Sequence, residues 1–153
     1  MDASGVYGDP MAAPRRTKAV ELFWRIHPHL YRWSGGRIGG RLQGMPVLLL
    51  HTTGRRSGEP RTNALTYFPK GVSFMVVASF LGEPRNPAWL LNLRTRADAE
   101  VLVGRARIPV RAREATGAER EQLWSEVISK APDYAEYQSR TERKIPIVVL
   151  DPR

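Results

Sequence analysis

Hydrophobic and polar residues recur with a helical period near the start of this chain. Over residues 17–33 apolar side chains lie three and four positions apart with arginines at the margins, which predicts an amphipathic helix. Pro28 falls inside this window, and we expect it to kink or divide the helix. Residues 1–16 contain glycine and proline without periodicity and predict a flexible N-terminal arm. The glycine-rich residues 34–41 predict a flexible, basic connector.

The middle of the chain has the patterns of β-strands. Residues 45–53 form an apolar run that stops at a glycine, which is typical of a buried strand. Residues 61–68 and 72–79 are two further strand patterns on either side of a Pro-Lys-Gly turn signature at 69–71. We therefore predict that these two segments pair with each other as a hairpin.

Helices and strands alternate in the last part of the chain. Residues 87–96 predict a short helix with proline at its first position. Thr116 and Glu119 have the spacing of a capping box, which opens a second helix that ends at Pro132. Further strands are predicted at residues 100–103, 106–113 and 145–150. About six mostly antiparallel strands with few helices predict an α+β fold, built as a small β-barrel or sandwich with helical additions.

Composition and charge narrow the classes of function. The 153 residues suit one domain, and the absence of cysteine excludes disulfides, iron–sulfur clusters and a cysteine nucleophile. The formal charge is +9, and only four of the 24 basic residues are lysine. Arginine-rich codon usage, an anionic ligand, nucleic acid or an acidic membrane surface would each account for this excess. Neither a secretory signal nor a run of roughly 20 apolar residues is visible, so we expect a cytoplasmic protein.

The densest group of candidate binding residues is the segment Gly54–Arg61, between two predicted strands. It holds three arginines, a serine and two glycines in eight positions. Glycines allow backbone N–H groups to turn toward a ligand, and arginines hold phosphate or carboxylate. The segment is not a Walker A loop, because Glu59 stands where the second glycine is required. An anion site and a solvated hairpin loop are the two interpretations of this segment.

Aromatic and polar residues at helical spacing form two further candidates. Trp89 and Asn92 share one face of the predicted helix 87–96, where they can stack on and hydrogen-bond a planar heterocycle. The alternative is that Trp89 packs in the core and Asn92 is a local cap. Tyr134 and Tyr137 can donate hydrogen bonds to a ligand or simply cover the core. No metal site is expected. The three histidines are His27, His29 and His51, and none of them has a carboxylate at the spacing of metal ligands. The short basic connector carries no recognisable nucleic-acid fold, so nucleic acid is not a favoured partner.

The chain resembles the deazaflavin-dependent nitroreductase family of actinobacteria, in the branch that uses coenzyme F-420. The resemblance runs from about Phe23 through Pro152 and is carried, in order, by the segments HTTGRRSGEPRTNALTY, VVASFLGEPRNPAWLLNL and APDYAEYQSRTERKIPIVVLDP. It implies the split β-barrel of flavin-binding reductases for residues 17–153. It also implies F-420, an 8-hydroxy-5-deazaflavin, as the cofactor in preference to FMN.

The resemblance assigns a cofactor role to each matching position. The phosphate and oligoglutamate tail would be held by Arg55, Arg56, Ser57, Gly58 and Arg61. The deazaflavin ring would be lined by Asn63, Val77, Ala78 and Ser79. The residues expected to close over the ring are Ala88, Trp89, Leu91 and Asn92.

The resemblance also implies the reaction. Reduced F-420 would pass a hydride to a flat, apolar acceptor such as a quinone, an enone or a nitroaromatic, while the protein binds and orients both partners. Tyr134 is the candidate catalytic residue, because a phenol can hydrogen-bond the acceptor oxygen and deliver a proton. The N-terminal helix over residues 17–33 suits either peripheral contact with the inner face of the membrane or packing on the barrel. A non-catalytic carrier of F-420 or of a fatty acyl ligand on the same fold is the alternative function.

Overall fold

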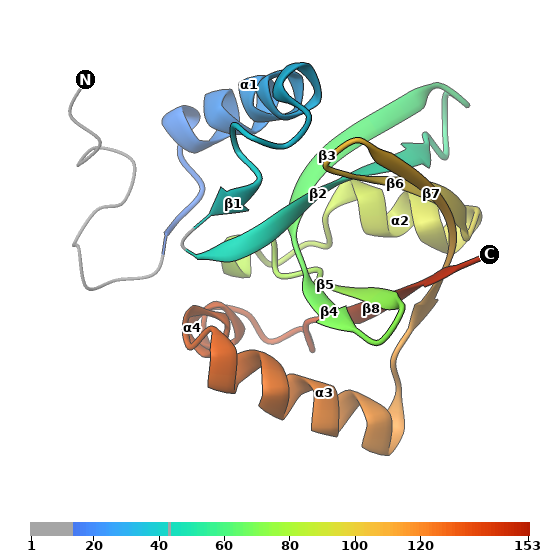
Figure 1. Cartoon of the computed structure of the whole chain (residues 1–153). Helices are drawn as coiled ribbons and strands as arrows, with labels where there is room; N and C mark the ends of the chain where they lie inside the picture. The colour runs from blue at the N-terminus through green and yellow to red at the C-terminus, as the bar shows by residue number, and fades with distance from the viewer. Residues whose placement is uncertain (1–13, 43) are drawn as a thin grey trace.

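A computed structural model describes residues 14–42 and 44–153 (Figure 1). The predicted N-terminal arm, residues 1–16, therefore lies outside the described residues except for its last three. Four α-helices and eight strands follow in this order: α1 (Lys18–Ser34), β1 (Arg41–Leu42), β2 (Met45–Thr53), β3 (Pro60–Thr66), β4 (Phe68–Lys70), β5 (Ser73–Val77), α2 (Ala88–Thr95), β6 (Asp98–Val103), β7 (Ala106–Glu114), α3 (Gly117–Lys130), α4 (Asp133–Ser139) and β8 (Ile147–Pro152). A short 3-10 helix, η2 (Phe80–Gly82), lies between β5 and α2.

The strands form one curled, antiparallel sheet in the order β1-β2-β6-β7-β8-β5-β4, and β3 pairs with β2 beside this path. Figure 1 shows the strands curling around an interior, with α3 and α4 packed outside β4, β5 and β8. Helix α2 contributes buried side chains to the interior itself. The predicted α+β split barrel is confirmed, and the structure has more strands than the sequence suggested.

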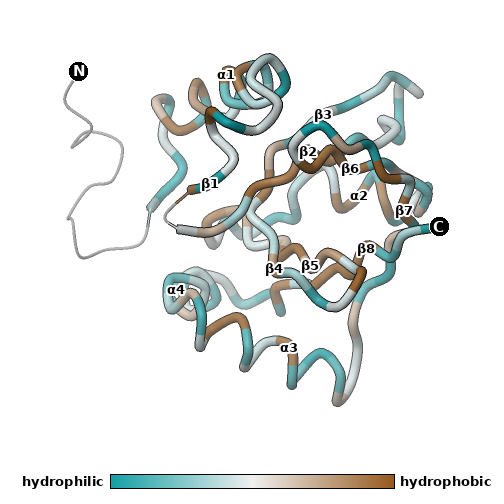
Figure 2. Tube along the Cα trace, viewed as in Figure 1, coloured by the Kyte–Doolittle hydropathy of each residue, from teal (hydrophilic) through white to brown (hydrophobic). Residues whose placement is uncertain are grey.

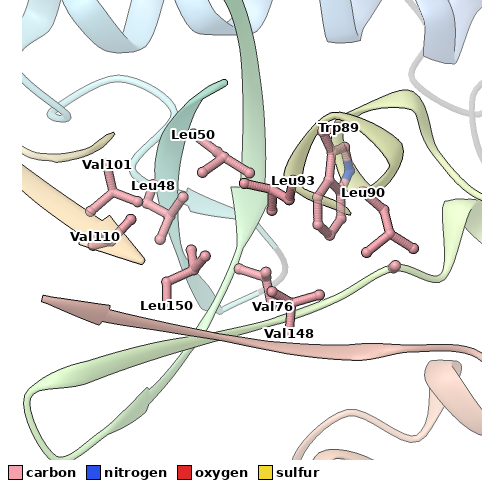
Figure 3. Packing of buried hydrophobic residues seen from close by; sticks show 11 residues of the cluster. Leu48, Leu50, Val76, Trp89, Leu90, Leu93, Val101, Val110, Val148 and Leu150 are labelled. Carbon is pink, nitrogen blue, oxygen red and sulfur yellow. The ribbon is translucent and has the colours of Figure 1, made fainter. Parts of the chain in front are cut away.

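The first six residues of strand β2 are apolar because both faces of the strand are covered there. Leu48 and Leu50 point into the barrel interior and pack with side chains of α2, β5 and β8 (Figure 3). Val47 and Leu49 alternate with them and pack under Tyr31 of α1. Successive side chains of a strand point to opposite faces, so a strand covered on both sides needs apolar residues at every position.

The same rule explains the apolar runs of β5 and β8. Val76 and Val148 belong to the barrel interior, whereas Met75 and Ile147 pack outward against α3 and α4. Figure 2 shows β5 and the start of β8 in brown, whereas residues along α3 range from teal to brown. Buried side chains thus lie inside the barrel and also on its outer surface, where one group packs against α3 and α4 and another packs against α1.

The predicted hairpin between residues 61–68 and 72–79 is wrong for most of its length. Strand β3 pairs instead with β2, in a register that runs from Val47 opposite Thr66 to Thr53 opposite Pro60. Only β4 pairs with β5 across the Pro-Lys-Gly turn. The nine-residue β2 offers β3 a longer partner that is buried on both faces, and this outweighs the local turn signal. The strands predicted at residues 100–103 and 106–113 are confirmed as β6 and β7, which pair with each other as an antiparallel hairpin.

Pro28 does not divide the predicted helix, because α1 runs unbroken from Lys18 to Ser34. The side chain of Pro28 is buried, and tertiary contacts hold the helix on both sides of it. The Tyr31 hydroxyl accepts a hydrogen bond from Gly104 N at 2.7 Å and donates one to Leu102 O at 3.3 Å. Packing of the helix against the sheet therefore outweighs the local cost of proline.

The glycine-rich connector is packed rather than flexible. Gly36 has a φ of 85°, and a side chain there would come within 3.0 Å of the Gly104 Cα atom. At Gly39 an added Cβ would overlap the His27 ring. These glycines are required because the connector passes close to α1 and to the β6–β7 turn.

The predicted capping box does not form, although Thr116 stands at the N-cap of α3. The Thr116 side chain makes no capping hydrogen bond. Glu119 instead accepts a hydrogen bond from Arg113 Nη1 at 2.7 Å. A charge-assisted bond to β7 competes successfully with the bond to a backbone N–H group.

Candidate functional site

The loop between β2 and β3 is held in shape by its own hydrogen bonds. Gly54 N donates to Glu59 O and Gly58 N donates to Gly54 O, each at 2.8 Å. Gly58 has a φ of 72°, the left-handed region that favours glycine. The Ser57 hydroxyl accepts bonds from Glu59 N at 3.1 Å and from Arg61 Nη2 at 3.3 Å. The turn therefore presents its arginines from a fixed backbone.

The charge of this loop is not neutralised from within the protein. The loop is exposed, and in the described part of the chain no hydrogen bond or ion pair occupies the guanidinium groups of Arg55 and Arg56. Two uncompensated cations on an ordered turn are suited to a phosphate or carboxylate ligand.

The Asn92 side chain connects α2 to this loop and to the end of β2 through two hydrogen bonds. This side chain is only 4% exposed. Its Oδ1 accepts a hydrogen bond from Arg55 N at 3.1 Å, and its Nδ2 donates to Thr52 Oγ1 at 3.1 Å. The structure thus gives Asn92 a positioning role that sequence reasoning did not foresee, since it is neither a local cap nor directed at open space.

Trp89 packs in the core, as one of the two interpretations expected, and it also borders the cavities. Most of its indole is buried in the barrel core beside Leu90 and Leu93 (Figure 3). Its remaining surface lines two adjoining cavities. Core packing therefore fixes the orientation in which this ring faces the cavities.

Two cavities lie side by side on the face formed by the loop, β3, α2 and α4. The first, of 390 Å³, has a lining of mixed polarity that includes the charged loop: Gly54, Arg55, Arg56, Ser57, Arg61, Thr62, Asn63, Ala88, Trp89 and Asn92. The second, of 560 Å³, is mainly apolar and reaches under α1 and η2; its walls include Phe23, Trp24, Leu65, Val77, Phe80 and Tyr134. Asn63, Ala88 and Trp89 belong to both, so the two cavities adjoin at these residues.

The structure brings most of the predicted cofactor residues together around the first cavity. Val77 and Ser79 line the second cavity instead. Gly58, Ala78 and Leu91 line neither cavity. Ala78 is fully buried; its N–H donates to Pro146 O at 2.9 Å, and its carbonyl accepts a bond from Arg143 at 3.1 Å. Its backbone is therefore engaged within the protein.

Tyr134 lies on the wall of the second cavity with its hydroxyl held in place. Its oxygen is 3.0 Å from Thr66 Oγ1 on β3. Its ring makes edge contacts with Phe68 and Tyr137, at centroid distances of 6.0 and 5.4 Å. Burial raises the pKa of Tyr134, so the phenol stays neutral and keeps its proton. A neutral phenol in a fixed position can donate a hydrogen bond into the cavity.

Sequence reasoning missed several residues of the site. Thr66 orients Tyr134, and Trp24 of α1 stacks on Phe80 at a centroid distance of 5.9 Å. Arg143 bonds the chain that leads from β5 to α2. Nothing in the local pattern separates these residues from other threonines, tryptophans and arginines, because their partners are distant in sequence.

The histidines stand apart from the cavities. His27 belongs to α1 and is buried, and burial lowers its pKa. His51 Nδ1 lies 2.8 Å from Thr62 Oγ1, and burial likewise lowers the pKa of His51. Over residues 14–42 and 44–153 there is no cluster of three side chains suited to a metal ion.

Residues 23–152 match the F420H(2)-dependent quinone reductase family, in which F420H(2) denotes reduced F-420. An F420H(2)-dependent quinone reductase of Mycobacterium tuberculosis (strain H37Rv) is 44% identical over 142 residues, which cover 90% of this chain and 95% of that protein. A putative F420H(2)-dependent quinone reductase of the same strain is 39% identical over 118 residues, covering 76% of this chain and 99% of that protein.

Solved structures show the same relationship. An F420-H2 dependent reductase, FDR-A, superposes with a TM-score of 0.63 at 36% identity, covering 69% of this chain and 94% of its own. A domain-swapped dimer superposes with a TM-score of 0.66 at 29% identity, covering 88% and 100%. A heme binding protein from Mycobacterium smegmatis, at 17% identity and a TM-score of 0.51 over 68% of this chain and 45% of its own, shares the fold alone.

Proposed function

The chain belongs to the F420H(2)-dependent quinone reductase family, and on this basis we propose how its two cavities divide the work. As a member it is an oxidoreductase that transfers a hydride from reduced F-420 to a quinone. The polar cavity binds the cofactor and the apolar cavity binds the quinone. The observation that carries this assignment is that the cavities share Asn63, Ala88 and Trp89, so that donor and acceptor would meet there.

The residues of the first cavity fit F-420. The cofactor ends in a phosphate and an acidic tail, and the uncompensated guanidinium groups of Arg55 and Arg56 match that charge. Arg61, bonded to Ser57, adds a third cation to the same wall. When bound, F-420 supplies the hydride, and the protein contributes orientation and exclusion of water. The role of each predicted cofactor residue stays part of this proposal.

Tyr134 is proposed as the proton donor to the quinone. Hydride addition leaves negative charge on a quinone oxygen, which needs a proton to form the hydroquinone. Burial raises the pKa of Tyr134, so the phenol is protonated at neutral pH, and Thr66 holds the hydroxyl in place beside the cavity. Solvent returns the proton to the phenolate after each turnover. Tyr134 is half-buried on the apolar wall, which supports contact with the acceptor rather than with the charged tail of the cofactor.

The outer face of α1 supports a further part of the proposal, peripheral contact with an anionic membrane surface. Its exposed apolar side chains are Leu22, Ile26, Leu30 and Trp33, and Trp33 is 77% exposed. Arginines flank this face, an arrangement suited to the lipid headgroup region. No helix in the described ranges is long and apolar enough to cross a bilayer. Phe23 and Trp24 line the quinone cavity on the same helix, so a docked α1 would bring that cavity to the lipid at the inner face of the membrane. In this proposal residues 17–153, helix α1 and the barrel together, form a single F-420-binding domain.

Binding and turnover with reduced F-420 test the cavity assignment. Arg56→Ala should weaken F-420 binding at least about tenfold, since it removes a charge-assisted contact of roughly 1.5–3 kcal/mol. Fluorescence titration measures the affinity, and oxidation of reduced F-420 by a soluble quinone measures turnover. Arg111→Ala is the matched control, because Arg111 is exposed and pairs with Asp98 away from the cavities. Unchanged affinity in Arg56→Ala would refute the loop assignment, and binding without turnover in the wild type would favour the carrier.

Vesicle binding tests the membrane contact. Trp33→Ser should reduce co-sedimentation with vesicles that contain anionic lipid, because it removes the most exposed aromatic side chain of the face. Its turnover of a soluble quinone should match the wild type. Equal sedimentation of the two proteins would count against docking through α1.

A further inference from the structure

The chain between β5 and α2, residues 78–87, forms one wall of the quinone cavity. Ser79, Phe80 and Leu81 line the cavity, and the same segment delivers Ala88 and Trp89 to the place where the two cavities meet. It contains no regular secondary structure except the short η2. Its shape must therefore come from contacts with other parts of the chain.

The middle of this segment has a strained backbone. Phe80 and Leu81 have φ values of 47° and 54°, in the left-handed region that non-glycine residues rarely adopt. Gly82 N donates to Ser79 O at 2.9 Å, and Glu83 N donates to Phe80 O at 3.0 Å, which closes a tight corner. Such a conformation persists only where the surroundings fix it.

Arg143, from the chain between α4 and β8, supplies that constraint. Nε donates to Glu83 O at 3.0 Å, Nη1 to Ala78 O at 3.1 Å and Nη2 to Ser79 O at 2.8 Å. Nη1 also donates to Asn86 Oδ1 at 3.0 Å. One guanidinium thus joins both ends of the corner.

The contacts of Arg143 differ from an ordinary ion pair. In the part of the chain that the structure describes, its acceptors are three carbonyls and one side-chain amide, and no carboxylate is among them. Four acceptors around one planar group require the fork of an arginine, which a lysine ammonium cannot reproduce. Arg140, three residues earlier, donates to Leu81 O at 3.1 Å and reinforces the same corner.

We propose that Arg143 is a positioning residue of the reaction, which holds the strained Phe80–Leu81 corner as the wall that fits the quinone. The inference rests on the proposed function of the apolar cavity and adds a determinant of acceptor fit outside the cavity lining. Loss of the clamp would let the corner relax toward ordinary backbone angles and move Phe80 away from Trp24. The cofactor loop would keep its shape, because its own hydrogen bonds and Asn92 hold it.

Hydrogen exchange and steady-state kinetics on Arg143→Lys test this inference. The matched control is Arg120→Lys, because Arg120 is also a buried arginine that donates to a carbonyl, Ile145 O at 2.8 Å, but it lies away from both cavities. In cofactor-free protein, exchange at the Gly82 and Glu83 amides should rise at least about tenfold in Arg143→Lys and stay unchanged in Arg120→Lys. In the kinetic assay KM for a soluble quinone should rise at least about fivefold, while F-420 affinity changes less than about threefold.

The outcomes separate this inference from the proposed function. Slow exchange at the corner in Arg143→Lys, or quinone kinetics equal to those of Arg120→Lys, would overturn the positioning role. Absence of quinone turnover in the wild type would instead overturn the proposed function. Asn86→Ala removes one acceptor only and should produce a smaller change in the same direction, which covers the case in which Arg143→Lys does not fold.

Discussion

Replacing Tyr134 by phenylalanine removes a single oxygen atom and tests the proposed chemistry of the second cavity. The change removes the hydroxyl that lies 3.0 Å from Thr66 Oγ1 and leaves the ring. The edge contacts with Phe68 and Tyr137 depend on the ring and should persist. The effects on stability and on catalysis can therefore be worked out separately.

The cost in stability should be small. One neutral hydrogen bond contributes about 1 kcal/mol net, and the Thr66 hydroxyl is half-buried, so it keeps access to water. A loss of about 1 kcal/mol lowers the melting temperature by roughly 2–4 °C in a protein of this size. F-420 affinity should not change, because Tyr134 is not part of the wall of the cofactor cavity.

The cost in catalysis should be much larger. A positioned general acid contributes about 10²–10⁴-fold to the rate, so kcat for a soluble quinone should fall at least about 100-fold. Thr66→Val is the companion variant, because it keeps the phenol and removes only its partner, and its loss should be smaller. Oxidation of reduced F-420 measured with each variant gives both values. A kcat within about twofold of the wild type in Tyr134→Phe would refute the proton-donor role.

Three further predictions concern the framework of the site. Asn92→Ala should cost about 2–4 kcal/mol of stability, because it removes two hydrogen bonds and leaves the buried Thr52 hydroxyl without its partner. The same change should weaken F-420 binding; thermal denaturation measures the first effect and fluorescence titration the second. Gly39→Ala should destabilise the protein by about 1–3 kcal/mol, because φ is +76° and the new Cβ would overlap His27; a melting temperature equal to the wild type would refute the packed connector. Burial raises the pKa of Tyr134 and Tyr137 above the unfolded value near 10, so the folded state keeps these protons to a higher pH than the unfolded state. The free energy of unfolding should therefore be unaffected by these groups below about pH 10 and fall above it, which denaturant titrations at a series of pH values would measure.

The site was predictable from the sequence in part. Gly54–Arg61 was identifiable because its charges and glycines are consecutive, and the resemblance to a known family connected it with Trp89 and Asn92. The functions of Asn92 and Arg143 were not identifiable. Each acts by holding another segment, 37 residues away from Asn92 at Arg55 and 64 residues away from Arg143 at Ser79. Sequence patterns carry information on neighbours along the chain and little on such partners.

The strands show the same difference: their positions could be predicted from the local sequence, whereas the pairing of β3 with β2 could not. The mainly apolar run of residues 45–53 predicted strand β2 and its burial, because a strand covered on both faces needs apolar side chains at successive positions. It did not determine the partner of that strand. The Pro-Lys-Gly turn suggested that residues 61–68 pair forward with 72–79, whereas β3 pairs back with β2.

The sequence by itself determined which segments of this protein are buried, where most helices and strands lie and which loop carries the charge, because these properties depend on periodicity and composition. Only the tertiary structure decided that Pro28 stays inside an unbroken helix, that the glycine connector is packed and that two arginines hold the strained corner beside the second cavity. Each of these outcomes is a balance between a local preference and contacts with distant residues. In a closed barrel the distant contacts are numerous enough to decide that balance.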